Sequence, residues 1–121
     1  MKIVVLKFGG TSVGTIEKIK KVTDIIIEHK KKKNKVIVVS SAMSGVTNDL
    51  IKKSKQISNN FIDSEYDVLV SSGEQVACSL IAGRLNHKGF KSRSWLGWQI
   101  PIFTNGPYTN SRIQQVNKNK L

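Results

Sequence analysis

A short apolar segment that ends in a lysine and two glycines is the feature that most constrains the fold of this chain. Residues 2–7 (KIVVLK) are largely β-branched and apolar, which is typical of a strand buried in a parallel sheet. Gly9 and Gly10 end this strand, and between about residues 15 and 32 apolar residues recur every three or four positions, as on one face of a helix. Residues 35–40 (KVIVVS) predict a second buried strand. Strand, helix and strand form a βαβ unit with a right-handed crossover.

The middle of the chain predicts helices that are separated by short loops. In chain order we expect a loop at 40–48, a short helix to about residue 58, a loop at 58–64, a helical segment from Tyr66 into SSGE (71–74), and a further helix at 75–87. The last of these helices carries an apolar face, and Gly89 is a good stop for it.

The rest of the chain predicts extended pieces and turns. We expect strands near 91–95 and 100–104, a turn-rich loop at 105–110 (NGPYTN) and a frayed polar end (QQVNKNKL). No internal repeat and no linker divides residues 1–121. The chain therefore predicts a single α/β domain with a mostly parallel sheet, and such sheets bind ligands beyond the carboxyl ends of their strands.

Length, cysteine content and hydropathy limit the class of protein. A chain of 121 residues is long enough for one domain with a modest core. Its single cysteine, Cys78, excludes an internal disulfide framework and favours a reducing compartment. The amino-terminal apolar run, residues 3–6, is too short for a signal peptide, and no stretch has the length of a membrane span. We expect a soluble cytoplasmic protein that does not bind membranes.

A formal net charge of +12 raises the question of polyanionic partners. The densest basic block is HKKKKNK (29–35), which lies where the first helix should end and where cations complement the helix dipole. No aromatic residues alternate with this block as a base-stacking surface would require. We therefore do not expect nucleic acid as the main partner, although a basic polyanion-binding module without catalysis stays an alternative.

The segment KFGGTSVG (7–14) has the composition of a phosphate-binding loop. Its glycines permit a sharp turn with free backbone N–H groups, the following helix begins with a partial positive charge, and Lys7 adds a full charge. The Walker A and G-x-G-x-x-G patterns do not match, because the lysine precedes the glycines and residue 11 is a threonine. The alternative is a tight strand-to-helix turn with a lysine that reaches solvent.

Two further places at strand or helix ends carry polar side chains. SSAMSGVTN (40–48) concentrates hydroxyl groups that could hold a small polar substrate, or could simply cap the next helix. SSGE places Glu74 at the expected start of a helix, where it could bind an ammonium group or only favour the first turn. His29 and His87 stand alone, so we expect no metal bound by side chains of the protein.

Three blocks of this sequence together resemble aspartate kinases of the amino acid kinase family. KFGGTSV, VIVVSSAMSGVTNDL and VLVSSGEQVACSLIAGRL are similar to three blocks of that family, in the same order and at similar distances. The resemblance implies the three-layer sandwich of that family. It also implies transfer of the γ-phosphoryl group of ATP, used with Mg²⁺, to the side-chain carboxylate of L-aspartate, the first step towards lysine, threonine and methionine.

The resemblance also assigns roles to individual residues. Catalysis falls to Lys7, which would neutralise charge on the transferring phosphoryl group. The ATP phosphates would be bound by Lys7, Phe8, Gly9 and Gly10. L-Aspartate would be bound by Ser41, Thr47 and Glu74, with Glu74 paired to its amino group. These roles agree with the chemistry, because phosphoryl transfer depends chiefly on positioning and charge stabilisation.

The chain also departs from the family pattern. Family enzymes are several times longer, and their later segments carry a second glycine-rich motif, the adenine pocket and regulatory ACT domains. The segment GWQIPIFTNGPYTNSRI keeps Gln99 and Arg112 in plausible places but has Trp98, Ile100 and Pro101 where the family favours small residues. We therefore expect residues 1–121 to be the amino-terminal part of an incomplete kinase domain. Such a chain is either inactive until a complementing chain or a homo-oligomer completes it, or a degenerate remnant.

Overall fold

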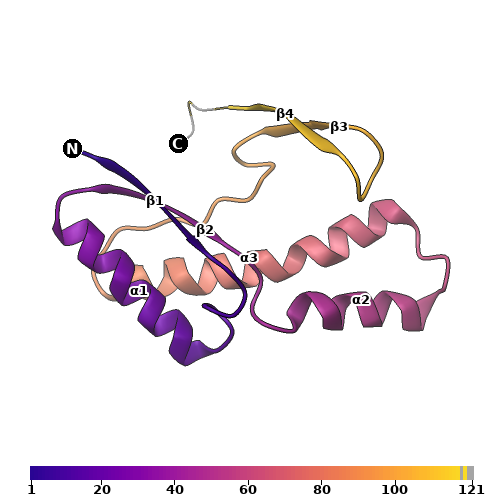
Figure 1. Cartoon of the computed structure of the whole chain (residues 1–121), viewed down its shortest axis with the longest axis horizontal. Coiled ribbons are helices and arrows are strands. Elements are labelled where there is room, and N and C mark those ends of the chain that lie inside the picture. The colour runs from indigo at the N-terminus through magenta and orange to yellow at the C-terminus, as the bar shows by residue number, and fades with distance from the viewer. Residues whose placement is uncertain (118, 120–121) are drawn as a thin grey trace.

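Two parallel strands and the helix between them form the base of the fold (Figure 1). The computed structural model describes residues 1–117 and 119. The elements in chain order are β1 (Ile3–Phe8), α1 (Ile16–Lys31), β2 (Lys35–Ser40), α2 (Val46–Ile57), α3 (Asp63–His87), β3 (Ile102–Asn105) and β4 (Arg112–Val116). The predicted β1–α1–β2 unit is confirmed, with β1 pairing parallel to β2 from Ile3↔Lys35 to Phe8↔Ser40.

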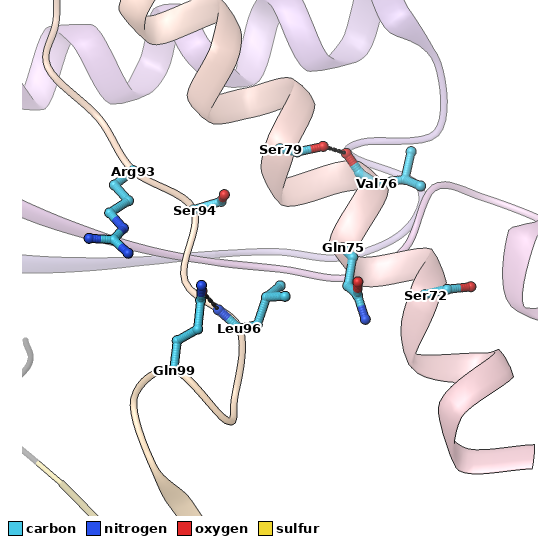
Figure 2. Close-up of a pocket in the computed structure, with 8 residues that line it drawn as sticks. All are labelled: Ser72, Gln75, Val76, Ser79, Arg93, Ser94, Leu96 and Gln99. Carbon is cyan, nitrogen blue, oxygen red and sulfur yellow. Dashed lines mark hydrogen bonds between the residues drawn. The ribbon is translucent and has the colours of Figure 1, made fainter. Parts of the chain in front are cut away.

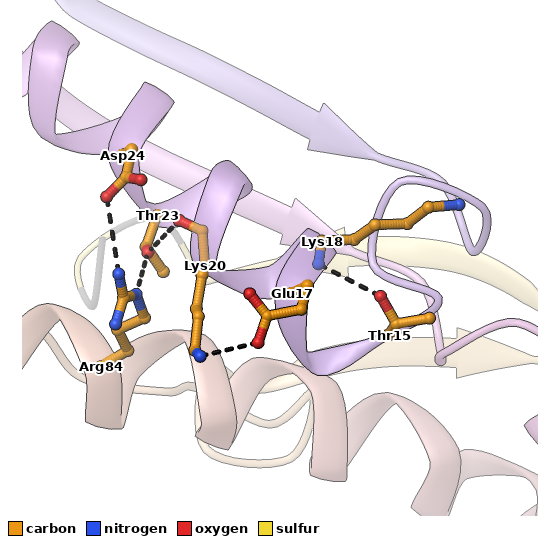
Figure 3. Close-up of polar contacts among 7 residues, drawn as sticks. All are labelled: Thr15, Glu17, Lys18, Lys20, Thr23, Asp24 and Arg84. Carbon is orange, nitrogen blue, oxygen red and sulfur yellow. Dashed lines mark hydrogen bonds and ion pairs between the residues drawn. The ribbon is translucent and has the colours of Figure 1, made fainter.

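Local sequence explains where α1 begins and ends. The Oγ1 atom of Thr15 accepts a hydrogen bond from the backbone N–H of Lys18 at 3.2 Å, which caps the first turn (Figure 3). In the same turn, a hydrogen bond from Lys20 lowers the pKa of the Glu17 carboxyl. The last turn is basic, as the helix dipole favours.

The hydrophobic core lies between one face of the β1–β2 sheet and the helices α1 and α3. It consists of Val13, Ile19, Val22, Ile26, Ile27, Ile81 and Leu85, against which Leu6, Phe8, Val36 and Val38 of the strands pack. Burial of each large aliphatic side chain contributes about 1.5–3 kcal/mol.

The opposite face of the β1–β2 sheet is uncovered among the described residues. Ile3, Val5 and Val39 are 60%, 61% and 48% exposed, since side chains alternate between the two faces of a strand. The β1–β2 sheet and the helices thus form two layers of the expected three-layer sandwich, and the β3–β4 pair is a separate sheet. Within residues 1–117 and 119, none of the helices combines the length and the hydropathy that crossing a membrane requires.

The expected division of α3 at SSGE (71–74) is wrong, because a single helix runs from Asp63 to His87. The hydroxyls of Ser71 and Ser72 donate to the carbonyls of Val68 and Leu69 in the preceding turn, so these serines stay within the helix instead of ending it. Gly73 is tolerated in mid-helix because it is buried against α2 and the loop that precedes it.

The carboxy-terminal part differs from the expectation in three ways. Residues 91–95 form no strand and run as an irregular segment, in which the Arg93 guanidinium stacks on the Trp95 ring at 4.0 Å. The expected strand near 100–104 is confirmed in part as β3, but it pairs antiparallel with β4 and is separate from the parallel sheet. Part of the segment expected to be frayed forms β4, while residues 118, 120 and 121 of that segment lie outside the described residues.

Candidate functional site

The three segments singled out in the sequence, two loops and the middle of α3, meet beyond the carboxyl ends of β1 and β2. The backbone N–H of Ser41 donates to the carbonyl of Phe8 at 3.0 Å, which ties the start of the second loop to the start of the first. The backbone N–H of Ala42 donates to Oε1 of Glu74 at 3.3 Å, which ties the second loop to α3. The parallel register thus brings together residues that are far apart in sequence.

Three glycines allow this close approach. A Cβ atom on Gly10 would lie 3.1 Å from the carbonyl oxygen of Ala42, and one on Gly14 would lie 3.0 Å from Cβ of Ser44. A Cβ atom on Gly73 would lie 2.9 Å from Cβ of Ala42. Side chains at these positions would push the loops apart, so glycine here serves the geometry of the site as well as the turn.

The loop that follows β1 presents unpaired hydrogen-bond donors. The Gly9 carbonyl accepts from the N–H groups of Ser12 and Val13 at 3.0 and 3.3 Å, and the fully buried Val13 side chain anchors the loop. Within the part of the chain that the structure describes, the N–H groups of Gly9 and Gly10 donate no hydrogen bond. Free donors beside the amino terminus of α1 are suited to an anion.

The side chains of Lys7 and Phe8 point to opposite faces of the sheet. Lys7 is exposed and shares the uncovered face with Ile3 and Val5. Phe8 packs against the hydrophobic core, and its carbonyl accepts from Ser41. Lys7 is therefore free to meet an anion, whereas Phe8 anchors the loop.

The hydroxyls predicted to bind a substrate flank the start of α2. Ser41 and Thr47 are both half-buried. The N-cap of α2 is Gly45, at a left-handed φ of 82°, with no side-chain cap hydrogen bond. The side chains of Ser44 and Thr47 therefore do not cap α2, and the Thr47 hydroxyl is available to a ligand.

Glu74 lies in the middle of α3 and not at a helix start. The favourable first-turn interaction considered from the sequence therefore does not account for this residue. Its carboxylate is exposed and accepts from the Ala42 N–H, so it borders the second loop with acceptor capacity to spare.

A hollow of about 600 Å³ lies between α3 and residues 93–99, and no spacing in the sequence indicates it (Figure 2). Its walls are Ser72, Gln75, Val76, Ser79, Arg93, Ser94, Leu96 and Gln99. Oε1 of Gln99 accepts from the backbone N–H of Leu96 at 3.0 Å, so this residue braces its own loop. None of the residues predicted from the sequence to bind ATP or aspartate lines this hollow.

Among the described residues, the charged side chains near these three segments do not form a metal-binding cluster. Within residues 1–117 and 119, no group of three or more His, Cys, Asp or Glu side chains is arranged to hold a metal ion. Around this common edge the described residues place the Lys7 ammonium group, the free N–H groups of Gly9 and Gly10, the hydroxyls of Ser41 and Thr47, and the Glu74 carboxylate.

Comparison with known proteins identifies relatives along the whole chain. A model of the amino acid kinase family matches residues 2–121. The chain is 46% identical over 121 residues to an aspartokinase of Geobacillus stearothermophilus, covering all of this chain and 30% of the relative. It is 44% identical over 124 residues to an aspartokinase of Rickettsia bellii, again covering all of this chain and 30% of the relative. The chain thus spans about 30% of the length of these relatives.

Solved structures share the fold. A crystal structure of an aspartate kinase from Synechocystis matches 71% of this chain and 15% of its own, with 42% identity and a TM-score of 0.68. The E. coli aspartokinase III structure in complex with aspartate and ADP matches 94% of this chain and 35% of its own, with a TM-score of 0.72. At 20% identity, that second match shows the fold alone.

Proposed function

Because this chain belongs to the amino acid kinase family, we propose that residues 7–14, residues 40–48 and Glu74 of α3 form the phosphate- and aspartate-binding part of an aspartate kinase site. The observation that carries the proposal is the contact between the Ala42 N–H and Glu74, together with the approach of Gly10 to the Ala42 carbonyl. These two contacts bring all three sequence blocks to one edge of the sheet.

The phosphate side of the site fits a triphosphate. The N–H groups of Gly9 and Gly10 would bind phosphate oxygens, and Lys7 would neutralise charge that develops as the γ-phosphoryl group leaves ADP. Phe8 would contribute by holding the loop in place. The described residues offer no side-chain cluster for Mg²⁺, so that ion would be held by the phosphates of ATP, and no role proposed here for a residue depends on it.

The substrate side of the site fits a small zwitterion. The hydroxyls of Ser41 and Thr47 would donate to a carboxylate of L-aspartate, and the Glu74 carboxylate would pair with its ammonium group. In the reaction, a side-chain carboxylate oxygen of aspartate forms a bond to the γ-phosphorus while the bond from that phosphorus to ADP breaks. The acceptor is already anionic, so the reaction needs no general base.

The proposed site needs further protein segments to hold the adenine base of ATP. We propose that residues 1–121 are the amino-terminal part of the kinase domain, and that the adenine base is held by segments other than these residues, which a complementing chain or a homo-oligomer could supply. A cytoplasmic location is part of the proposal, since the single thiol favours a reducing compartment. Phosphate binding without turnover, as in a degenerate remnant, is the alternative.

Ligand titration of the isotope-labelled chain tests the proposal. ADP should shift the amide resonances of Gly9 and Gly10, and Lys7→Ala should weaken ADP binding about tenfold, the effect of losing one charged hydrogen bond. Lys35→Ala, at the other end of the sheet, is the matched control and should leave binding unchanged.

L-Aspartate tests the other side of the same site. Glu74→Gln should weaken aspartate binding about tenfold and leave ADP binding intact. Succinate lacks the ammonium group and should bind equally to both forms. Absence of shifts with both ligands, or equal binding by wild type and Lys7→Ala, would refute the proposal.

A further inference from the structure

At one end of the molecule α1 and α3 finish and β1 and β2 begin (Figure 1), and the segments that meet there contain eight lysines. They are Lys2, Lys30, Lys31, Lys32, Lys33, Lys35, Lys88 and Lys91, and we call them the lysine end. The backbone N–H of Lys35 donates to the carbonyl of Lys2 at 2.9 Å, and Lys30 and Lys91 line one hollow of about 100 Å³ between α1, β2 and residues 90–92. The fold therefore adds three lysines from two other segments to the block at 29–35.

Almost no negative side chains accompany these lysines. In the segments that form the lysine end (1–3, 28–35 and 86–92), Glu28 is the sole carboxylate. It pairs with Lys31 at 3.3 Å across one helical turn, and both side chains are well exposed. The other seven lysines form no ion pair within the part of the chain that the structure describes.

Helix dipoles account for only a small part of this charge. Two helices, α1 and α3, end here, and each contributes a partial negative charge of about one half at its carboxyl terminus. Together they offset about one unit, against seven uncompensated lysines. The sequence alone suggested that the block at 29–35 serves to complement helix dipoles. That electrostatic effect is too small to explain the whole cluster of lysines.

We propose that the lysine end binds the phosphate backbone of duplex nucleic acid without regard to sequence. Lysine supplies point charges, whereas recognition of bases typically uses the bidentate geometry of arginine, and the lysine end has no arginine. Phe90, the one Phe, Tyr or Trp in these segments, packs against the core and offers no surface on which single-stranded bases could stack. This surface lies at the opposite end of the strands from the loops of the candidate site, so both can be occupied at once.

Fluorescence anisotropy with a labelled 20-base-pair duplex tests this proposal. If about four lysines contact phosphates, the logarithm of the affinity should fall against the logarithm of salt concentration with a slope of about −3.6. The triple variant Lys30→Gln, Lys32→Gln and Lys91→Gln should bind at least tenfold more weakly at low salt, with a slope shallower by about 2.7.

The matched control removes the same charge from another surface. Lys52→Gln, Lys53→Gln and Lys55→Gln on α2 also delete three positive charges and should change duplex affinity less than twofold. Circular dichroism melts establish that both variants fold. Equal weakening by the two triple variants would mean that only net charge matters and would overturn the proposal. A tighter association with phosphatidylglycerol vesicles than with the duplex would also overturn it, as would an absence of duplex binding at low salt.

Discussion

Arg84 and Thr23 join α3 to α1 through a hydrogen bond between side chains that are 61 residues apart (Figure 3). Nε of Arg84 donates to Oγ1 of Thr23 at 2.8 Å, and that hydroxyl donates to the Lys20 carbonyl at 2.7 Å. Thr23 is fully buried, so the guanidinium has a fixed acceptor between the two helices that cover the sheet.

Thr23→Val should destabilise the fold by about 1–3 kcal/mol, because it leaves a partly buried Arg84 donor without its acceptor. Asp24→Asn is the control, since Asp24 lies 3.8 Å from Arg84 with a side chain that is 63% exposed, and its loss should cost less than about 0.5 kcal/mol. Urea unfolding followed by circular dichroism measures both. Equal losses of stability in the two variants would show that the buried hydrogen bond contributes no more to stability than the exposed ion pair.

Gly73→Ala and Gly83→Ala should have opposite effects although both glycines lie in α3. A Cβ atom at Gly73 would clash with Ala42 and should cost about 1–3 kcal/mol, while one at Gly83 meets nothing within 4 Å and should stabilise the helix by about 1 kcal/mol. Thermal melts report stability, and titration with L-aspartate reports the site. Unchanged aspartate binding by Gly73→Ala would mean that the approach of α3 to the second loop does not matter for the site.

Burial raises the pKa of the Cys78 thiol above its ordinary value. The thiolate should therefore be scarce at pH 8, and Cys78 should react with Ellman's reagent several-fold more slowly in the folded chain than in urea. The Cys78 thiol ionises at a lower pH in the unfolded chain than in the folded one. Its contribution to the free energy of unfolding should therefore be fully present below the ordinary thiol pKa and be lost as the pH rises through the raised pKa. Equal reaction rates in buffer and in urea would contradict the prediction.

The uncovered face of the β1–β2 sheet should cause self-association that depends on concentration. Exposed apolar side chains and unpaired strand edges both favour it. Val5→Thr with Val39→Thr should shift the equilibrium towards monomer in size-exclusion chromatography with light scattering. Ile57→Thr, which removes an exposed apolar side chain at the end of α2, should not. A wild-type chain that stays monomeric at high concentration would rule this out.

The 121-residue chain by itself should show no aspartate-dependent formation of ADP. The resemblance to aspartate kinases places the adenine pocket and a second glycine-rich motif in segments that these residues do not include. A coupled assay for ADP, with Lys7→Ala as the control, measures this. Robust turnover that requires aspartate and is abolished by Lys7→Ala would falsify the prediction.

The βαβ unit could be predicted because its signals are local. The apolar runs of β1 and β2 and the three- and four-residue spacing in α1 each reflect one element and one buried face. The loops could also be placed, because parallel strands bring their carboxyl ends to one edge. Features of this kind need no knowledge of distant contacts.

The errors came from residues whose conformation depends on contacts that sequence patterns do not reveal. Ser72 and Gly73 look like helix breakers, but the Ser72 hydroxyl donates within α3 and Gly73 packs against Ala42, so α3 is continuous. The segment at 91–95 has the composition of a strand but pairs with none; Asn86 exchanges two hydrogen bonds with Ser92, and Arg93 stacks on Trp95. The gathering of lysines at one end was also beyond sequence reasoning, since it follows from where α1 and α3 both finish.

The alternation of side chains along β1 has a thermodynamic consequence for Lys7. Ile3, Val5 and Lys7 lie on the same face of the strand, so any surface that covers the two apolar side chains also borders the ammonium group. Covering that face lowers the local dielectric and strengthens the attraction between Lys7 and a bound anion. Association on this face and anion binding are therefore linked equilibria, and each must alter the affinity of the other by the same factor. A ligand as small as phosphate would then act as an effector of assembly.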